Sequence, residues 1–129
     1  MPERKHSKKR DAIYECLRNT TTHPSAEWVY AQLKPTIPDL SLGTVYRNLR
    51  TFREEGKLIS VGVVNGLERF DARTSPHAHF VCRRCSAVLD VDSIALPERL
   101  SLELDCGEVE DYTLTLSGLC RDCIKHDAS

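Results

Sequence analysis

The sequence predicts an α+β fold: an N-terminal winged helix (a helix-turn-helix plus a β-hairpin wing) followed by a small α/β domain. Three observations predict it. Amphipathic helical segments fill residues 8–55, and an Asn65-Gly66 turn between apolar runs follows. Two Cys-x-x-Cys pairs then lie near the beginning and the end of the last third of the chain. The expected boundaries are 1–72 for the winged helix, 73–76 for a hinge and 77–129 for the second domain.

The first two helices are predicted from apolar residues at helical spacing and from local stop signals. Residues 8–19 carry such a pattern and end in a polar loop. Ser25 is placed to cap a second helix, which Lys34 ends because Pro35 follows it and disfavours the helical conformation of the preceding residue.

Ser41 is expected to cap a third helix that runs to about Glu55 and is closed by Gly56. One face is apolar, and the opposite face is small, polar and cationic. Such a face is often simply solvated. Here it belongs to the third helix of a helix–turn–helix pattern, which favours contact with DNA bases and phosphates. The predicted contacts are Thr44, Tyr46, Arg47 and Arg50.

A β-hairpin is predicted next, because residues 58–64 and 67–70 are rich in apolar side chains and flank Asn65-Gly66. This hairpin is the expected wing. We expect Arg69, together with the basic N-terminal run, to contact DNA phosphates.

The second domain is expected to begin with short strands near 78–82 and 87–91, joined at the first cysteine pair. If they pair antiparallel, His79 lies opposite Asp90. A helix over Pro97–Leu104, a strand over Tyr112–Leu116 and a charged tail complete the expected elements.

Two pairs of cysteines predict a closed tetrahedral zinc site that clamps the ends of this domain. A secreted disulfide scaffold, a redox dithiol and unpaired buried thiols are the alternatives. The expected zinc ligands are Cys82, Cys85, Cys120 and Cys123, whereas Cys16 and Cys106 are isolated and are expected in the core.

His77 and His79 are two residues apart, so on a strand both imidazoles project from one face. Such a pair can be exposed and idle. Nearby carboxylates and one more imidazole, in the loop before the second helix, suggest an open nitrogen and oxygen site suited to Fe²⁺, Mn²⁺ or Zn²⁺. The candidate ligands are His23, Asp71, His77, His79 and Asp90.

Charge is divided unevenly along the chain. Residues 1–75 carry 13 Lys and Arg against 9 Asp and Glu, and residues 76–129 carry 5 against 10. A basic first half suggests a polyanionic partner for that half only. Phosphate-loop, nucleophile and zinc-deaminase motifs do not occur, so no enzyme and no small-molecule substrate are predicted. No apolar run is long enough for a membrane span, and a cytoplasmic location is expected.

The chain resembles the Fur (ferric uptake regulator) family of metal-dependent repressors over nearly its whole length. The matching motifs are His23-Pro24-Ser25-Ala26, Leu42-Gly43-Thr44-Val45-Tyr46-Arg47-Asn48-Leu49, Arg69-Phe70-Asp71, His77-Ala78-His79-Phe80-Val81-Cys82-Arg83-Arg84-Cys85 and Gly118-Leu119-Cys120-Arg121-Asp122-Cys123.

The resemblance implies a homodimer, joined through its α/β dimerisation domain, whose winged helices bind an AT-rich palindrome in double-stranded operator DNA. It also implies structural Zn²⁺ at the cysteines and regulatory Fe²⁺ or Mn²⁺ at the histidine and aspartate set. Aspartate at both Asp71 and Asp90 is similar to the peroxide-sensing (PerR-like) branch. In that branch, Fe²⁺ reacts with H₂O₂ and the oxidant formed attacks ligand histidines, here His23 or His77. Mn²⁺ represses without sensing.

Three hypotheses follow. The first is a peroxide-responsive repressor, and the second is an iron, zinc or manganese homeostasis repressor without peroxide sensing. The third is a zinc-stabilised storage or interaction protein whose helix–turn–helix is incidental.

Overall fold

The computed structural model describes residues 7–97 and 104–128. The chain divides into two units, Met1–Thr74 and Ser75–Ser129, and each is described by itself below. Both combine helices with a small β-sheet, which confirms the predicted α+β class. Among the described residues, no helix is both long and apolar enough to cross a membrane.

The second and third helices of the first unit begin where the sequence predicts them, because serine caps fix their starts. The Ser25 hydroxyl accepts the amide of Trp28 at 3.1 Å, and the Ser41 hydroxyl accepts the amide of Thr44 at 3.1 Å. Each serine thereby satisfies an amide that lacks a partner within the helix. The helices are α1 (Ser7–Arg18), α2 (Ala26–Leu33) and α3 (Leu42–Glu54).

The wing is an antiparallel hairpin of β1 (Ile59–Val64) and β2 (Leu67–Asp71). Asn65 and Gly66 both have positive φ, at 52° and 85°. A two-residue turn with two positive φ angles matches the right-handed twist of the strands that it joins. The predicted turn is therefore confirmed.

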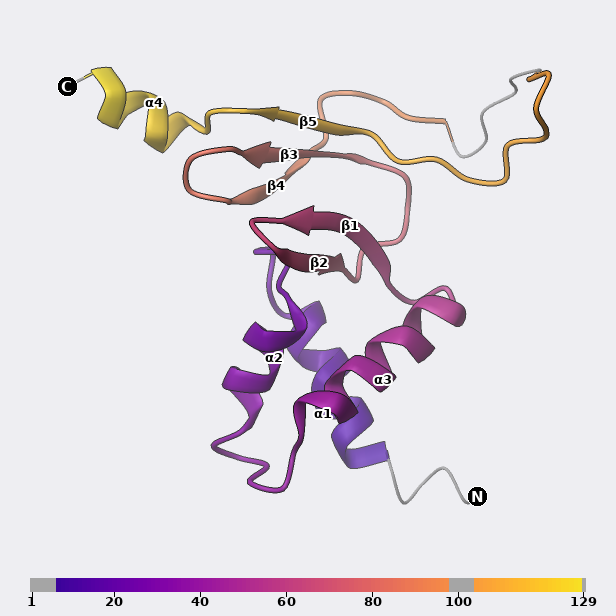
Figure 1. The fold of residues 1–129 in the computed structure, drawn as a ribbon, viewed down its shortest axis with the longest axis vertical. Helices are drawn as coiled ribbons and strands as arrows, with labels where there is room; N and C mark the ends of the chain where they lie inside the picture. The colour runs from indigo at the N-terminus through magenta and orange to yellow at the C-terminus, as the bar shows by residue number, and fades with distance from the viewer. Residues whose placement is uncertain (1–6, 98–103, 129) are drawn as a thin grey trace. The chain divides into compact units, whose positions relative to one another are not determined.

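The three helices lie together beside the hairpin (Figure 1). One hydrophobic core of buried side chains joins them. Phe52 is only 1% exposed and packs against the Tyr14 ring with centroids 5.1 Å apart. Replacing such a phenylalanine with alanine typically costs about 3–5 kcal/mol. The buried members are Ile13, Leu17, Ala26, Val29, Leu40, Val45, Leu49, Phe52, Leu58 and Phe70.

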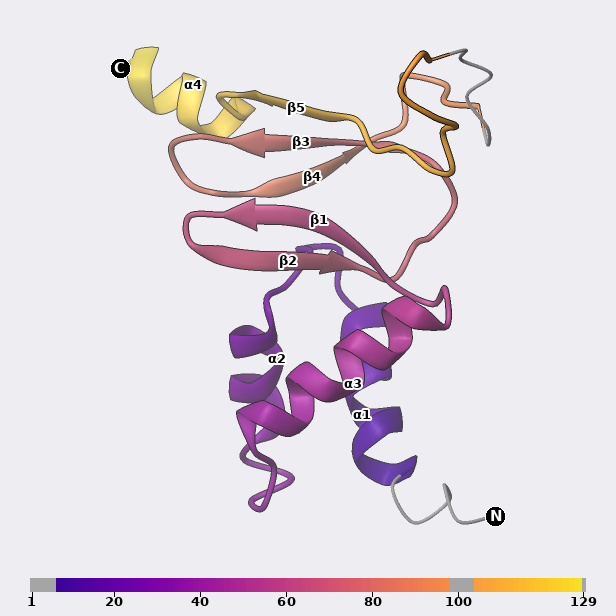
Figure 2. The same cartoon turned by 45° about the vertical axis from the view of Figure 1, so that its right-hand side comes forward.

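The second unit contains a three-stranded sheet with β3 in the middle (Figure 2). β3 (Ala78–Cys82) pairs antiparallel with β4 (Val88–Val91) and parallel with β5 (Thr115–Gly118). His79 lies opposite Asp90, as the sequence predicts. α4 (Arg121–Ala128) follows β5.

Three details of this unit differ from prediction. The strand expected over Tyr112–Leu116 lies further along the chain, at β5 (Thr115–Gly118). Its position is set by pairing with β3, because Gly118 pairs with Cys82 and the Gly118 carbonyl accepts the amide of Arg83. The expected charged tail contains α4, and Cys106 is exposed rather than in the core. The helix expected over Pro97–Leu104 falls on residues 98–103, outside the described part.

Candidate metal centres and nucleic-acid interface

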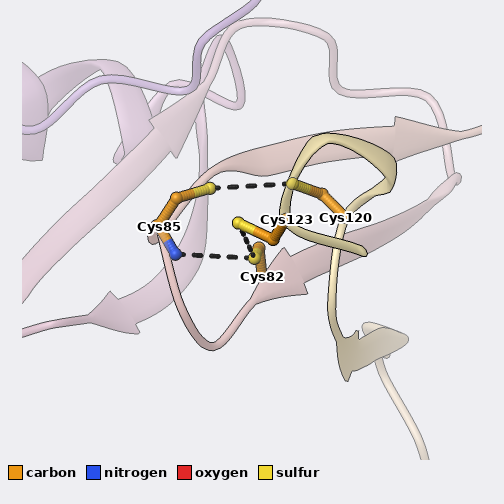
Figure 3. Close-up of side chains that lie close together, drawn as sticks. All are labelled: Cys82, Cys85, Cys120 and Cys123. Atoms are coloured by element: carbon orange, nitrogen blue, oxygen red, sulfur yellow. Dashed lines mark hydrogen bonds between the residues drawn. The ribbon is translucent and has the colours of Figure 1, made fainter. Parts of the chain in front are cut away.

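Four cysteine side chains converge at one end of the second unit (Figure 3). Cys82 ends β3 and Cys85 lies in the turn to β4. Cys120 immediately precedes α4, and Cys123 lies in its first turn. Their sulfur atoms all lie within 4.8 Å of one another. One pair comes from the β3–β4 turn and the other from the start of α4, so two short local segments supply the whole cluster.

The sulfur spacing tests what this cluster can hold. Cys82 Sγ lies 3.6 Å from Cys123 Sγ, and Cys85 Sγ lies 3.8 Å from Cys120 Sγ. A disulfide requires about 2.05 Å. A tetrahedral zinc site with bonds of about 2.3 Å places its sulfurs about 3.8 Å apart. The geometry therefore fits a closed Zn²⁺ site and not a pair of disulfides.

Two thiols of the cluster have pKa values shifted in opposite directions. Cys82 has its pKa lowered to about 5, chiefly because the backbone amide of Cys85 donates to its sulfur, at 3.5 Å. Cys123 has its pKa raised to about 12, chiefly by burial and then by the neighbouring thiols. Like charges in one cluster push their pKa values apart. A divalent cation would neutralise the thiolates together, so the donor chemistry fits the metal as well.

Two buried imidazoles and a partly exposed carboxylate lie together at the opposite end of β3. His77 Nε2 lies 2.8 Å from Asp90 Oδ1, and His79 Nε2 lies 3.5 Å from the same oxygen. The two imidazole centroids are 4.3 Å apart. The other nitrogen of His77, Nδ1, lies 2.8 Å from the Ser75 carbonyl, a contact that fixes the ring orientation.

A second imidazole–carboxylate pair lies within the first unit. His23 Nε2 lies 3.2 Å from Asp71 Oδ2, and both side chains are buried. The other Asp71 oxygen, Oδ1, accepts the backbone amide of Arg73 at 2.8 Å. The carboxylate is thus held at the end of β2 with one oxygen turned to the imidazole.

These donors suit a divalent cation that accepts nitrogen and oxygen ligands. Buried carboxylates carry a high desolvation cost unless they are paired, and a metal ion is one such partner. Imidazole with carboxylate is a donor set for Fe²⁺, Mn²⁺ or Zn²⁺. The structure brings together His77, His79 and Asp90 in one unit, and His23 and Asp71 in the other. That all five share one ion stays a prediction.

The predicted DNA-contacting face of α3 borders an open cavity of about 820 Å³ within the first unit. Its lining includes Lys8 and Lys9 of α1 and Arg47 of α3, together with Asp39, which pairs with Lys9 at 3.1 Å. Arg47 donates from Nη2 to the Thr44 hydroxyl at 3.0 Å, which orients the guanidinium along the helix. Cationic side chains beside hydroxyl groups make a surface that suits phosphate oxygens.

Tyr46 is 41% exposed on α3, and its hydroxyl donates a hydrogen bond to the carboxylate of Glu27 on α2. That bond, more than burial, raises the pKa of Tyr46 above its usual range. The carboxylate therefore holds the tyrosine ring in one orientation at the surface.

Sequence reasoning missed three residues that orient these groups: Glu27, Ser75 and Arg69. Ser75 acts through its backbone carbonyl, so its side chain gives no signal. Glu27 lies 19 positions from Tyr46, and only the packing of α2 on α3 brings them together. The sequence predicts a phosphate contact for Arg69 but not the hydrogen bonds from its guanidinium to the backbone of the loop before α2.

A winged helix with a cationic third helix, followed by a domain with a thiolate cluster, defines the class of metal-binding winged-helix proteins. A family model described as "Ferric uptake regulator family" matches residues 3–116, and the chain belongs to this family.

Two curated relatives are similar over most of their length. The Peroxide operon regulator of Bacillus subtilis is 35% identical over 120 residues, 92% of this chain and 83% of that protein. The Peroxide-responsive repressor PerR of Staphylococcus aureus is 32% identical over 116 residues, 88% of this chain and 78% of that protein.

Solved structures agree in fold. The ferric uptake regulator of Helicobacter pylori superposes with a TM-score of 0.72 at 19% identity, covering 96% of this chain and 87% of that one. The Campylobacter jejuni peroxide stress regulator gives 0.71 at 23% identity, covering 94% and 93%. At these identities the likeness concerns the fold alone.

Proposed function

We propose that the chain is a metal-dependent, peroxide-responsive transcriptional repressor that binds operator DNA as a homodimer. The observation that carries the proposal is a buried imidazole paired with a carboxylate in each unit, His23 with Asp71 and His77 with Asp90. The relatives named as peroxide regulators support it. Regulators of this family are not enzymes, and no small-molecule substrate is expected.

In this proposal Fe²⁺ or Mn²⁺ is held jointly by the ligands of both units. His23 and Asp71 belong to the winged helix, whereas His77, His79 and Asp90 belong to the other domain, and residues 73–76 act as the hinge. Sharing one ion would restrict the angle between the domains. Metal binding and operator binding would then favour the same conformation and strengthen each other.

Peroxide is proposed to release the operator by destroying ligands. Bound Fe²⁺ would activate H₂O₂ so that one oxygen atom is added to an imidazole carbon of His23 or His77 and the other leaves as water. The oxidised ring loses basicity as a ligand, and the domains separate. Asp71 and Asp90, both short carboxylates, are the residues that favour this branch through the resemblance.

The cysteine cluster is proposed to hold structural Zn²⁺ and to stabilise the dimerisation domain. Its sulfur spacing supports the assignment. A closed thiolate site contributes folding free energy directly. The dimer would place two α3 helices on an AT-rich palindrome, since a two-fold protein matches a two-fold operator. Such a repressor works beside the chromosome, in the cytoplasm.

A homeostasis repressor that responds to iron, zinc or manganese occupancy alone is the second candidate. The same donor set favours it, because imidazoles and carboxylates bind these ions whether or not peroxide is present.

Two experiments test these proposals. Gel shifts with and without Mn²⁺ should show metal-dependent operator binding. The absence of metal-dependent binding would reject both regulator functions. Mass spectrometry of the Fe²⁺-loaded protein after peroxide should show one added oxygen on His23 or His77. Unmodified histidines in a metal-dependent DNA binder would favour the homeostasis repressor.

A further inference from the structure

The candidate ligand His23 has an unusual backbone conformation. Its φ is 56°, in the left-handed region that non-glycine residues seldom adopt. The residue is also 3% exposed and is followed by Pro24, which starts the approach to α2. A strained, buried conformation persists only where its surroundings hold it. Neighbouring groups must therefore hold the loop at this position.

Arg69 of β2 supplies that restraint. Its Nε donates to the His23 carbonyl, and its Nη2 donates to the Thr22 carbonyl at 2.8 Å. A guanidinium presents several donors in one rigid plane, so it can grip two successive carbonyl groups at once. Burial lowers the pKa of Arg69, which agrees with a side chain turned inward to the loop.

The next two residues of β2 also contact this loop. The amide of Phe70 donates to the Pro24 carbonyl at 3.0 Å, on the other side of His23. Asp71 is two residues beyond Arg69, so the two side chains project from the same face of the strand. Asp71 contacts the His23 imidazole, while Arg69 holds the His23 backbone. Side chains from one face of β2 thus orient both the backbone and the imidazole of His23.

A bulge in the partner strand lies beside this contact. The pairing of β1 with β2 shifts between Ser60 and Gly62, opposite Phe70 and Arg69. Bulges increase local twist and redirect side chains. The irregular register of the wing therefore coincides with the residue that turns inward to the loop.

We propose that Arg69 is a positioning residue for the regulatory metal site. Arg69 holds the backbone of His23 in the conformation that directs its imidazole toward Asp71. The second strand of the wing then carries both a ligand, Asp71, and the clamp for another ligand, His23. This inference rests on the proposed function, in which His23 binds the ion. It makes metal affinity depend on a residue that has no ligand atom of its own.

The test compares Arg69→Lys and Arg69→Gln with the intact zinc-loaded dimer. Lysine keeps the charge but loses the planar fork. Mn²⁺ affinity, measured by electron paramagnetic resonance of the free ion, should fall about 10–100-fold in Arg69→Gln, as for other residues that orient metal ligands, and by a smaller factor in Arg69→Lys. The control is Arg53→Gln, since Arg53 pairs with Glu68 of the same strand at 3.2 Å and does not touch the loop.

A second readout separates positioning from general stability. After peroxide treatment of the Fe²⁺-loaded protein, peptide mass spectrometry should show the added oxygen shifted from His23 toward His77 in both variants. His77 is oriented within the other unit, through Ser75 and Asp90, so it serves as an internal reference. Loss of fold alone would lower oxidation of both histidines together. If Arg69→Gln does not fold, the Mn²⁺ affinity and oxidation pattern of Arg69→Lys provide the test.

His23→Ala distinguishes the two possible failures. If His23→Ala binds Mn²⁺ as tightly as the intact protein, His23 is not a ligand and the proposed function fails. If His23→Ala loses affinity while both Arg69 variants match Arg53→Gln in affinity and oxidation pattern, the role of Arg69 is wrong and the proposed function stands.

Discussion

Arg47 and Arg53 lie on the same helix but have different surroundings. Arg47 borders the cavity of α3 and contacts Thr44, whereas Arg53 pairs with Glu68 of the wing. Both positions follow from helical periodicity. The Thr44 partner of Arg47 follows from the same periodicity, whereas the Glu68 partner of Arg53 lies on β2 and is set by the tertiary fold.

Arg47→Ala should weaken operator binding by about 1–3 kcal/mol, because a guanidinium that contacts a base edge or a phosphate is lost. Arg53→Ala is the matched control and should change affinity little. Titration gel shifts at several salt concentrations measure both. Equal losses in the two variants would contradict the assigned face of α3.

Glu27→Gln should lower the pKa of Tyr46 toward its usual value, because the charged acceptor of its hydroxyl is removed. The folded chain raises this pKa, so the contact stabilises the fold below the ordinary tyrosine pKa of about 10 and loses its effect as pH rises through the higher folded value. An ultraviolet titration of tyrosinate, referenced to Tyr46→Phe, measures the shift. An unchanged Tyr46 titration would rule out Glu27 as the cause.

At the scale of elements, locally encoded features were predicted well. The caps Ser25 and Ser41 and the Asn65-Gly66 turn depend on residues a few positions apart, so their chemistry can be read directly. β5 was misplaced because its bounds are set by parallel pairing with β3, far away in sequence. α4 was missed because a short, charged segment gives a weak apolar pattern.

The cysteine cluster lies between the turn after β3 and the start of α4, which bound zinc would hold together. Cys82→Ser or Cys120→Ser should abolish the dimer, because a closed thiolate site loses a ligand and with it folding free energy. Cys106→Ser is the control, since Cys106 is exposed and lies outside the cluster. Metal analysis and sedimentation of each variant provide the measurement. A Cys82→Ser protein that stays folded and dimeric would contradict a structural role for zinc.

At the scale of the whole molecule, the candidate ligands are divided between two units. The sequence could indicate candidate donors from their residue types, and the pairing of His79 with Asp90 follows from strand register. It could not identify what orients them, because the Ser75 carbonyl and the Arg69 clamp depend on backbone geometry.

His77→Ala should keep the fold but lose metal-dependent operator affinity. The core of the winged helix does not include this residue, so melting of that unit should change little. Circular dichroism and gel shifts with added Mn²⁺ measure the two properties separately. Unchanged operator affinity would show that the histidine cluster has no regulatory role.

If one ion takes ligands from both units, three imidazoles should coordinate it, and these can be counted. Electron–nuclear double resonance of the Mn²⁺-loaded dimer, with ¹⁵N-labelled histidine, reports each coordinated ring. We predict coupling to the nitrogens of His23, His77 and His79, and one imidazole fewer in His23→Ala. An identical spectrum from His23→Ala would contradict the claim, because the ion would then be held without the DNA-binding unit's imidazole.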